Sequence, residues 1–104
     1  MIKHVNSQNF ENEVLNKDKL VVVDFFATWC GPCKMLTPEL ETVAESRADF
    51  DIVKVDIDEA EDLAIKYNVA VVPTLIMFKD GKEVDRVSGF MTGEVLTSRV
   101  EELL

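Results

Sequence analysis

The chain has two cysteines, Cys30 and Cys33, and their spacing is the first feature that could support chemistry. Small secreted scaffolds use four or more cysteines with long loops between partners, so this single C-x-x-C pair does not form a stabilising disulfide framework. A bridge that closes so short a ring stabilises a fold by only about 2 kcal/mol. A closed zinc site takes four ligands, and the only histidine, His4, leaves it incomplete without a second chain. The main alternatives are reversible dithiol chemistry and two inert cysteines.

The hydrophobic pattern places this pair between a strand and a helix. Residues 20–27 form an apolar run without alternation, rich in β-branched and aromatic side chains, which is typical of a strand buried on both faces. A long helix is predicted after Cys33, and Pro38 in its interior is expected to kink it. We expect this helix to carry the following residues inward: Met35, Leu36, Leu40, Val43 and Ala44.

The rest of the chain alternates between further strands and helices. The predicted strands are Ile2–Val5, Ile52–Asp56, Thr74–Lys79 and Lys82–Ser88, the last two joined by a type I′ turn at Asp80-Gly81. The predicted helices cover residues 9–16, a segment capped by Asp58 with Glu61 in the capping box, and a last segment that starts at Thr92. Such alternation implies parallel strands with right-handed crossovers, and the final hairpin adds an antiparallel edge.

The expected fold class is therefore α/β, a three-layer α/β/α sandwich around a central mixed five-stranded sheet. Residues 1–104 are expected to form a single domain, because a chain of this length that is 47% hydrophobic suits one core. Sites in open α/β sheets lie beyond the carboxyl ends of the strands. Cys30 follows the carboxyl end of the most apolar strand, so pattern and topology indicate the same place.

Charge and hydropathy narrow the classes of partner. Lys and Arg number 11 against 20 Asp and Glu, and a net charge of −9 disfavours binding to nucleic acid. The apolar stretch Leu20–Val23, which ends at a charge, is far shorter than the roughly 20 residues needed to cross a bilayer, and no other apolar stretch approaches that length. We expect a soluble monomer with no membrane partner. No apolar segment follows Lys3, so no secretory signal is visible and the predicted location is the cytoplasm.

The spacing of the cysteines suits reversible disulfide formation. In the first turn of a helix, residues three apart share a face with Cβ atoms about 5–6 Å apart. Cys30 is expected at the helix N-terminus, where unpaired N–H groups and the helix dipole favour the thiolate, so it is the predicted nucleophile. Cys33 lies one turn inside and faces the core, so we expect a less accessible, resolving thiol. Pro32 suits the first helical turn, where ordinary helix initiation also explains it.

Residues 29–34, Trp-Cys-Gly-Pro-Cys-Lys, resemble the active-site signature of the thioredoxin family. The resemblance covers the whole chain, with matches in order and approximate spacing at Val23-Asp24-Phe25, Pro38, Lys54, Val72-Pro73-Thr74 and Gly89. It implies the thioredoxin fold and a thiol–disulfide oxidoreductase that reduces disulfides in client proteins. It also implies that Cys30 attacks the client and Cys33 releases it. A flavoprotein thioredoxin reductase would recharge the Cys30–Cys33 pair, with no other cofactor and no metal.

Two polar residues on predicted strands acquire roles from this resemblance. Asp24 interrupts the most apolar strand, and burial of a carboxylate predicts a raised pKa. The resemblance implies that Asp24 assists proton transfer to and from Cys33, and that Lys54 tunes the Asp24 carboxyl. The alternatives are a structural carboxyl that is hydrogen-bonded in the core and a lysine that snorkels from a partly covered strand.

The resemblance assigns substrate binding to residues around the pair, namely Trp29, Gly31, Pro32, Val72, Pro73 and Gly89. It implies a cis bond before Pro73, which faces the disulfide and frees the Val72 backbone to pair with an extended client segment. Trp29 would shield the thiols, and Gly89 would keep the rim open. The simpler explanations are a proline at the start of a strand, a general aromatic contact and a turn glycine.

The chain departs from the commonest pattern of the family at three positions. Phe26 stands where many members have tryptophan, Val71 where a small residue is usual, and Phe90 where alanine is frequent. We expect all three near the docking rim, where they would change the choice of partner and leave the chemistry in place.

Two other functional classes compete with a disulfide reductase. A scaffolding subunit would not depend on its thiols, and the intact Cys30 and Cys33 disfavour that as the sole role. A disulfide oxidase or isomerase usually has histidine between its cysteines, so Gly31-Pro32 favours reduction. The sequence leaves open whether the reductase draws electrons from NADPH or ferredoxin, and what redox potential the pair has.

Overall fold

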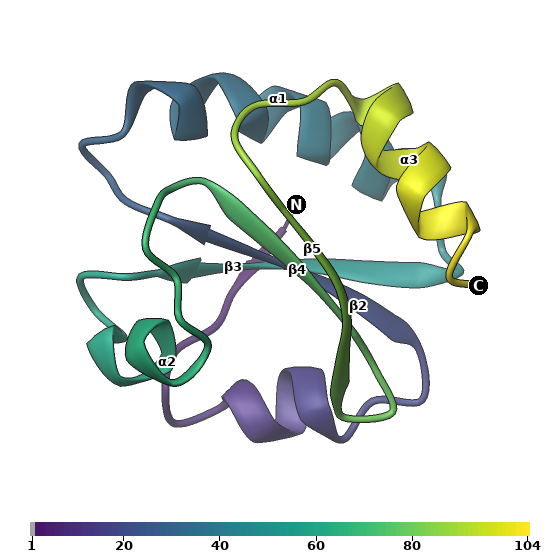
Figure 1. The fold of residues 1–104 in the computed structure, drawn as a ribbon. Coiled ribbons are helices and arrows are strands. Elements are labelled where there is room, and N and C mark those ends of the chain that lie inside the picture. The colour runs from purple at the N-terminus through teal and green to yellow at the C-terminus, as the bar shows by residue number, and fades with distance from the viewer. Residues whose placement is uncertain (1) are drawn as a thin grey trace.

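The computed structural model describes residues 2–104 and contains one mixed sheet with helices on both faces (Figure 1). Its strands are β1 (Lys3–His4), β2 (Leu20–Phe26), β3 (Phe50–Asp56), β4 (Thr74–Lys79) and β5 (Lys82–Ser88). Its helices are η1 (Glu11–Leu15), α1 (Gly31–Ser46), α2 (Glu61–Lys66) and α3 (Gly93–Glu101). The strand order is β1-β3-β2-β4-β5, so the predicted α/β class and the mixed five-stranded sheet are confirmed.

β2 is the central strand of the sheet, and all seven of its residues are buried. β3 pairs with it in parallel along the full strand, and β4 pairs with it antiparallel on the other side. An apolar run without alternation is what such a position requires, because neither face meets water. Pairing on both sides holds the end of β2 in place, and Cys30 follows that end after three residues of loop.

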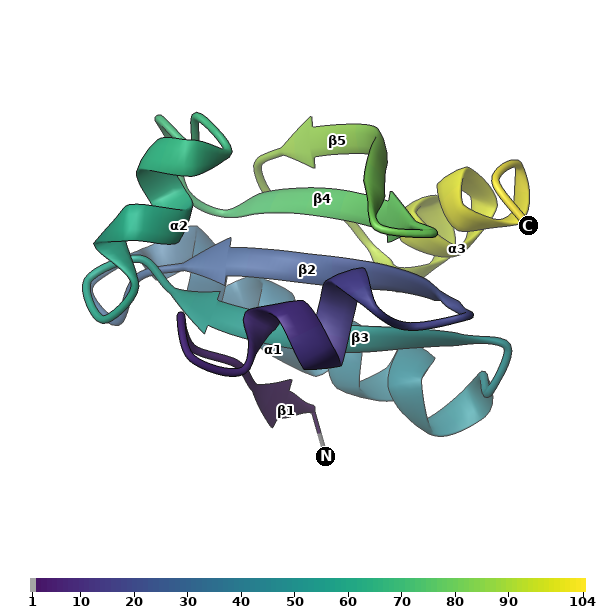
Figure 2. The same ribbon diagram turned by 90° about the horizontal axis from the view of Figure 1, so that it is seen from below.

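Alternate residues of β2 face two separate apolar clusters. Val22 belongs to one cluster with Leu36 of α1 and Leu96 of α3. Val23 belongs to the other, with Leu63 of α2. Figure 1 shows α1 and α3 on one side of the sheet and α2 on the other, and Figure 2 shows the N-terminal helix in front of the strands with α1 behind them. The three layers therefore follow from the twofold alternation of side chains on a fully buried strand.

One residue of α1 points the opposite way from the prediction. The helix continues through Pro38 as expected, but the Met35 side chain is 62% exposed. The buried residues of α1 are Cys33, Leu36, Leu40 and Val43, whose spacings of three and four follow one face of the helix. Met35 lies about 100° around the helix from Leu36 and therefore leaves that face. The prediction that Met35 faces the core, which rests on its hydrophobicity alone, is therefore wrong.

The predicted cap of α2 is also wrong. The residue before Glu61 is Ala60, and no side chain within residues 2–104 caps the helix. The Asp58 carboxylate instead accepts a hydrogen bond from Trp29 Nε1 at 2.9 Å. The local pattern predicts that the Asp58 carboxylate binds the N-terminus of α2, but the carboxylate binds Trp29, which is far away in the sequence.

The N-terminal elements are shorter than predicted. β1 is limited to two residues, which pair in parallel with Val53 and Lys54 of the edge-facing side of β3. The predicted helix over residues 9–16 is reduced to η1, in which the Asn16 amide donates to the Glu11 carbonyl five residues back at 2.9 Å. Val14 of this helix is buried in the core, and the half-buried Leu15 packs against the same cluster.

The C-terminal hairpin and helix agree with the sequence. Asp80 has φ 53° and Gly81 has φ 80°, the left-handed values that a type I′ turn needs at both central residues. Thr92 caps α3, and its side-chain oxygen accepts a hydrogen bond from the Val95 amide at 3.3 Å.

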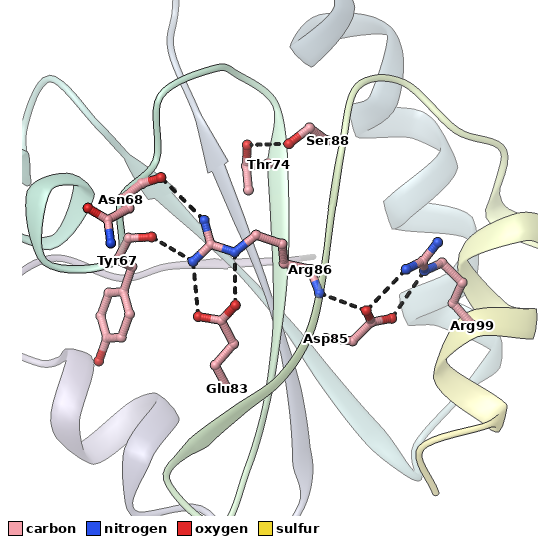
Figure 3. A network of polar contacts seen from close by, with 8 residues as sticks. All are labelled: Tyr67, Asn68, Thr74, Glu83, Asp85, Arg86, Ser88 and Arg99. Carbon is pink, nitrogen blue, oxygen red and sulfur yellow. Dashed lines mark hydrogen bonds and ion pairs between the residues drawn. The ribbon is translucent and has the colours of Figure 1, made fainter.

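Two arginines tie the edge strand β5 to the rest of the fold (Figure 3). Arg86 contacts both carboxylate oxygens of Glu83, at 2.8 and 2.9 Å, and also donates to the Tyr67 carbonyl at 2.6 Å. Arg99 of α3 donates twice to Asp85, each time at 3.1 Å. Since the carbonyl of Tyr67 lies at the end of α2, Arg86 joins this helix to the far edge of the sheet.

Replacement of Arg86 by Met should destabilise the fold more than loss of an exposed ion pair. The variant removes a bidentate pair and leaves a carbonyl without its donor, so we expect the free energy of unfolding to fall by about 1–2 kcal/mol. Lys3→Met is the matched control, since it removes a cation whose single ion pair to Glu13 is exposed. Denaturant unfolding measures both variants, and equal losses would contradict the bridging role of Arg86.

Candidate functional site

The two cysteines form a disulfide at the N-terminus of α1, with their Cα atoms 5.3 Å apart. Cys30 is the N-cap residue, and its sulfur accepts a hydrogen bond from the Cys33 amide at 3.2 Å. Pro32 occupies the first turn of the helix, as expected. The Cys30 sulfur therefore lies at the positive end of the helix dipole, where a thiolate is stabilised.

Access does not distinguish the two sulfurs in the disulfide form. Cys30 is 5% exposed and Cys33 is 3% exposed, so the expected difference in accessibility is slight. Both pack with Phe26 and Ala27 at the end of β2. The asymmetry of the pair therefore lies in the position of each residue relative to the helix N-terminus.

Asp24 lies in the middle of β2, fully buried, on the face that packs against α1. Neither of its carboxylate oxygens has a hydrogen-bond partner among residues 2–104. Burial raises the pKa of Asp24 from 3.8 to about 7, and the charge of Lys54 acts in the opposite direction. The predicted raised pKa is thus borne out, with desolvation as its main cause. The alternative of a carboxyl held by hydrogen bonds in the core does not fit.

Lys54 is the register partner of Asp24 on β3, but no ion pair between the two is formed within the described residues. The Lys54 ammonium donates to Thr37 Oγ1 at 2.9 Å and lies 4.6 Å from the centre of the Phe26 ring. Lys54 is buried, with 8% exposure, so these contacts replace much of its hydration. The sequence offered no reason to select Thr37, since its role depends on the packing of α1 over β3.

A pocket of about 240 Å³ opens beside these residues. It is lined by Phe26, Ala27, Thr28, Cys33, Lys34, Thr37 and Lys54. Cys33 and Lys54 thus line one hollow. A larger hollow of about 810 Å³ lies between α1 and α3, and none of its lining residues belongs to the site.

The loop before β4 lies against the disulfide cluster. The Val72–Pro73 bond is cis, as the resemblance implies, and Val72 packs against the cluster that contains both cysteines. The Pro73 carbonyl accepts a hydrogen bond from the Gly89 amide at 2.9 Å. Below this contact, the Thr74 hydroxyl is 3.0 Å from the Ser88 hydroxyl (Figure 3). Two segments from different strands are thereby joined next to the cysteines.

Gly89 is required for its backbone conformation. Its φ is +90°, a value that residues with a side chain rarely adopt, while a Cβ at this position would meet nothing within 4 Å. The reason for glycine at this position is therefore the backbone conformation. A side chain would have space here, but the positive φ disfavours one.

The rim of the site exposes large apolar side chains. Trp29 is 68% exposed, Val71 57% and Phe90 44%. Gly31 and Pro32 are also exposed at the start of α1. Phe26 does not belong to this rim, contrary to the prediction, because it is only 8% exposed and supports the Lys54 ammonium from within.

Neither a metal centre nor a spanning helix is found among residues 2–104. No three His, Cys, Asp or Glu side chains are grouped so as to hold a metal ion. The helices in this part of the chain are too short or too polar to cross a membrane. His4, the one histidine, lies with its ring edge-on to Phe26 at 5.6 Å.

A buried central strand that leads into a helix capped by a redox-capable cysteine pair defines a class, the thiol–disulfide oxidoreductases. Comparison with known proteins narrows the class further. The family model named Thioredoxin matches residues 1–102. The chain is 51% identical over 84 residues to Thioredoxin-2 of Saccharomyces cerevisiae, covering 81% of each chain. It is 47% identical over 102 residues to Thioredoxin of Chlamydia pneumoniae, covering 98% of each chain. The chain belongs to the thioredoxin family and is a thiol–disulfide oxidoreductase.

Removal of the Asp24 charge should stabilise the protein at neutral and alkaline pH. The carboxyl has a pKa of 3.8 in the unfolded chain and about 7 in the fold, so ionisation favours unfolding. The gain in Asp24→Asn should be absent below pH 4, grow between pH 4 and 7, and reach at most about 4 kcal/mol above that range. Denaturant unfolding across the pH range measures it.

Asp18→Asn, on an exposed turn, is the control for this experiment. Its free energy of unfolding should follow that of the unmodified chain at every pH. An Asp24→Asn variant that is less stable than the unmodified chain at pH 8 would show that the carboxylate is structural.

Proposed function

We propose that the chain is a protein-disulfide reductase in which Cys30 attacks and Cys33 resolves. The observation that carries the proposal is the Cys30 sulfur at the N-cap of α1, within hydrogen-bond distance of a backbone amide. A thiolate gains stability there from the amide and from the helix dipole. Cys33 lies inside the helix and has no equivalent position.

The reaction transfers two electrons from the dithiol to the client. The Cys30 thiolate attacks one client sulfur, the client S–S bond breaks, and the second client sulfur leaves as a thiolate. The Cys33 thiol loses its proton and attacks Cys30 Sγ. The Cys30–Cys33 bond then forms, and the first client sulfur leaves and takes up a proton.

Asp24 is proposed to accept the Cys33 proton in the second step and to return it when the disulfide is reduced. It is the only titratable residue of β2 and faces α1, which carries Cys33. A general acid–base group works best when its pKa lies near the working pH, and the raised pKa of about 7 meets this condition. Lys54 is proposed to tune this carboxyl through its charge.

Client binding is proposed to use the rim and the backbone of the loop before Pro73. Val72 packs against the cysteine cluster, and within residues 2–104 its amide and carbonyl take part in no hydrogen bond. An extended client segment could pair with these groups as a short added strand, which gives affinity without strong sequence preference. Trp29, Gly31, Pro32 and Gly89 surround the same place and are the proposed flanking contacts.

The proposed cycle closes when a flavoprotein thioredoxin reductase restores the dithiol, with NADPH or ferredoxin as the electron source. No cofactor besides the Cys30–Cys33 disulfide is needed for the exchange steps. We further propose electron transport to several client proteins by a cytoplasmic monomer. The absence of a histidine between the cysteines favours this reductant role over that of an oxidase.

The assignment of the attacking thiol can be tested by trapping. Cys33→Ser should accumulate mixed disulfides between Cys30 and client proteins, because the second step has lost its nucleophile. Cys30→Ser, the matched control, should trap none. Non-reducing electrophoresis with mass spectrometry identifies the joined cysteines, and equal trapping by both variants would refute the assignment.

The redox potential of the pair separates a reductant from an oxidant. Equilibration with glutathione buffers should give a redox potential of about −270 mV, which is the general figure for thioredoxins. A potential above about −180 mV would instead identify a disulfide-forming or isomerising protein.

A further inference from the structure

The Lys54 ammonium is held by contacts that the family signature does not include. Its Nζ donates to Thr37 Oγ1 at 2.9 Å, and Thr37 Oγ1 in turn donates to the Cys33 carbonyl at 3.2 Å. On the other side, the ammonium lies over the Phe26 ring. A hydroxyl that accepts from one group and donates to another is held in one orientation. The ammonium is therefore held at Thr37 of α1, one turn from Cys33.

The Asp24 carboxyl is the other acceptor to which this ammonium could turn. Asp24 and Lys54 are register partners on neighbouring strands, so their side chains leave the same face of the sheet side by side. Both carboxylate oxygens nevertheless have no hydrogen-bond partner in the described part of the chain. A buried carboxyl and a buried ammonium on adjacent strands are thus kept from forming an ion pair.

We propose that Thr37, assisted by Phe26, is a positioning residue that holds the Lys54 ammonium beside α1 and away from the Asp24 carboxyl. The proposal rests on the proposed proton-transfer role of Asp24 for its functional meaning. The structural part of the proposal does not depend on that role. It states that the Thr37 hydroxyl selects one of two possible positions of the Lys54 ammonium.

The charges around Asp24 make Lys54 the decisive neighbour. β4 places the apolar Leu75 opposite Asp24, and α1 contributes the disulfide-bonded Cys33. Other charged or titratable groups near this end of the sheet include His4 on β1, Lys34 in the pocket wall, Asp56 at the end of β3 and Asp58 beside Trp29. Only Lys54 affects the pKa of Asp24 through its charge, and it lowers it.

Without the Thr37 hydroxyl, the buried ammonium would lose its acceptor and turn to the nearest one left. An opposite charge within about 4–6 Å lowers the pKa of a carboxyl by 1–3 units. With a pKa of about 7, Asp24 keeps a large neutral fraction near pH 7, whereas a direct ion pair would lower the pKa and leave the carboxyl mostly ionised.

The test measures the Asp24 pKa by carbon NMR in the oxidised protein, where the cysteines do not titrate. Thr37→Val keeps the shape of the side chain without the hydroxyl and should lower the Asp24 pKa by about one unit, a tenfold change in protonation. Thr37→Ser keeps the hydroxyl and should restore the original value. Thr37→Ala is a second removal of the hydroxyl should the Val variant fold poorly.

Thr37→Val and Thr37→Ser in a Lys54→Met background provide the matched control. There the Asp24 pKa should not respond to Thr37→Val, because the ammonium is gone. An unchanged or raised pKa in the Thr37→Val single variant, or an equal lowering without Lys54, would overturn the proposal. The pH profile of client reduction is measured in parallel. A lowered pKa with an unchanged profile supports the positioning role and refutes instead the proton-transfer role of Asp24.

Discussion

The burial of β2 on both faces is the constraint on which the rest of the structure depends. A strand in the centre of a mixed sheet is removed from water only if helices cover both sides, which is why α1 and α3 pack on one face and η1 and α2 on the other. The chain leaves the end of this strand and enters α1 within a few residues. The position of Cys30 at the helix N-terminus is therefore set by the packing of a strand that contains no cysteine.

The same burial creates the unusual carboxyl of the site. Desolvation that favours the apolar residues of β2 penalises the ionised form of Asp24. Because the carboxylate has no hydrogen-bond partner within residues 2–104, only the charge of Lys54 offsets part of that penalty. A carboxyl at an exposed position would remain ionised at neutral pH. Stability of the strand and acid–base behaviour near pH 7 thus have one physical origin, and they act against each other at this residue.

In the proposed function, recognition and chemistry are supplied by different parts of the fold. The sheet and α1 hold the buried groups, whereas loops present the exposed Trp29, Val71 and Phe90 around them. Trp29 is fixed at one end by its hydrogen bond to Asp58. An exposed apolar rim with free backbone groups would suit the proposed clients, which share a disulfide but little else.

The sequence was sufficient to predict the α/β class and the order of the elements. It was also sufficient to predict the cysteine pair at a strand-to-helix junction and the raised pKa of Asp24. Each depends on local periodicity or on the burial of one strand, and both are visible in the order of residue types. The failures share a different cause. Met35 departs from its predicted inward position because hydrophobicity does not specify the face of a helix. Phe26 departs from the predicted rim because its burial depends on the elements that surround it.

Contacts between distant residues were decided by the tertiary structure alone. Asp58 could accept from the α2 N-terminus or from the Trp29 indole, and Lys54 could donate to Asp24 or to Thr37. In both cases the distances to the competing groups are set only when the layers pack. Sequence spacing carries no information about such competitors when they lie on other elements. The residue types that perform the chemistry are thus determined by the sequence, while the partner that each polar side chain takes is determined by the fold.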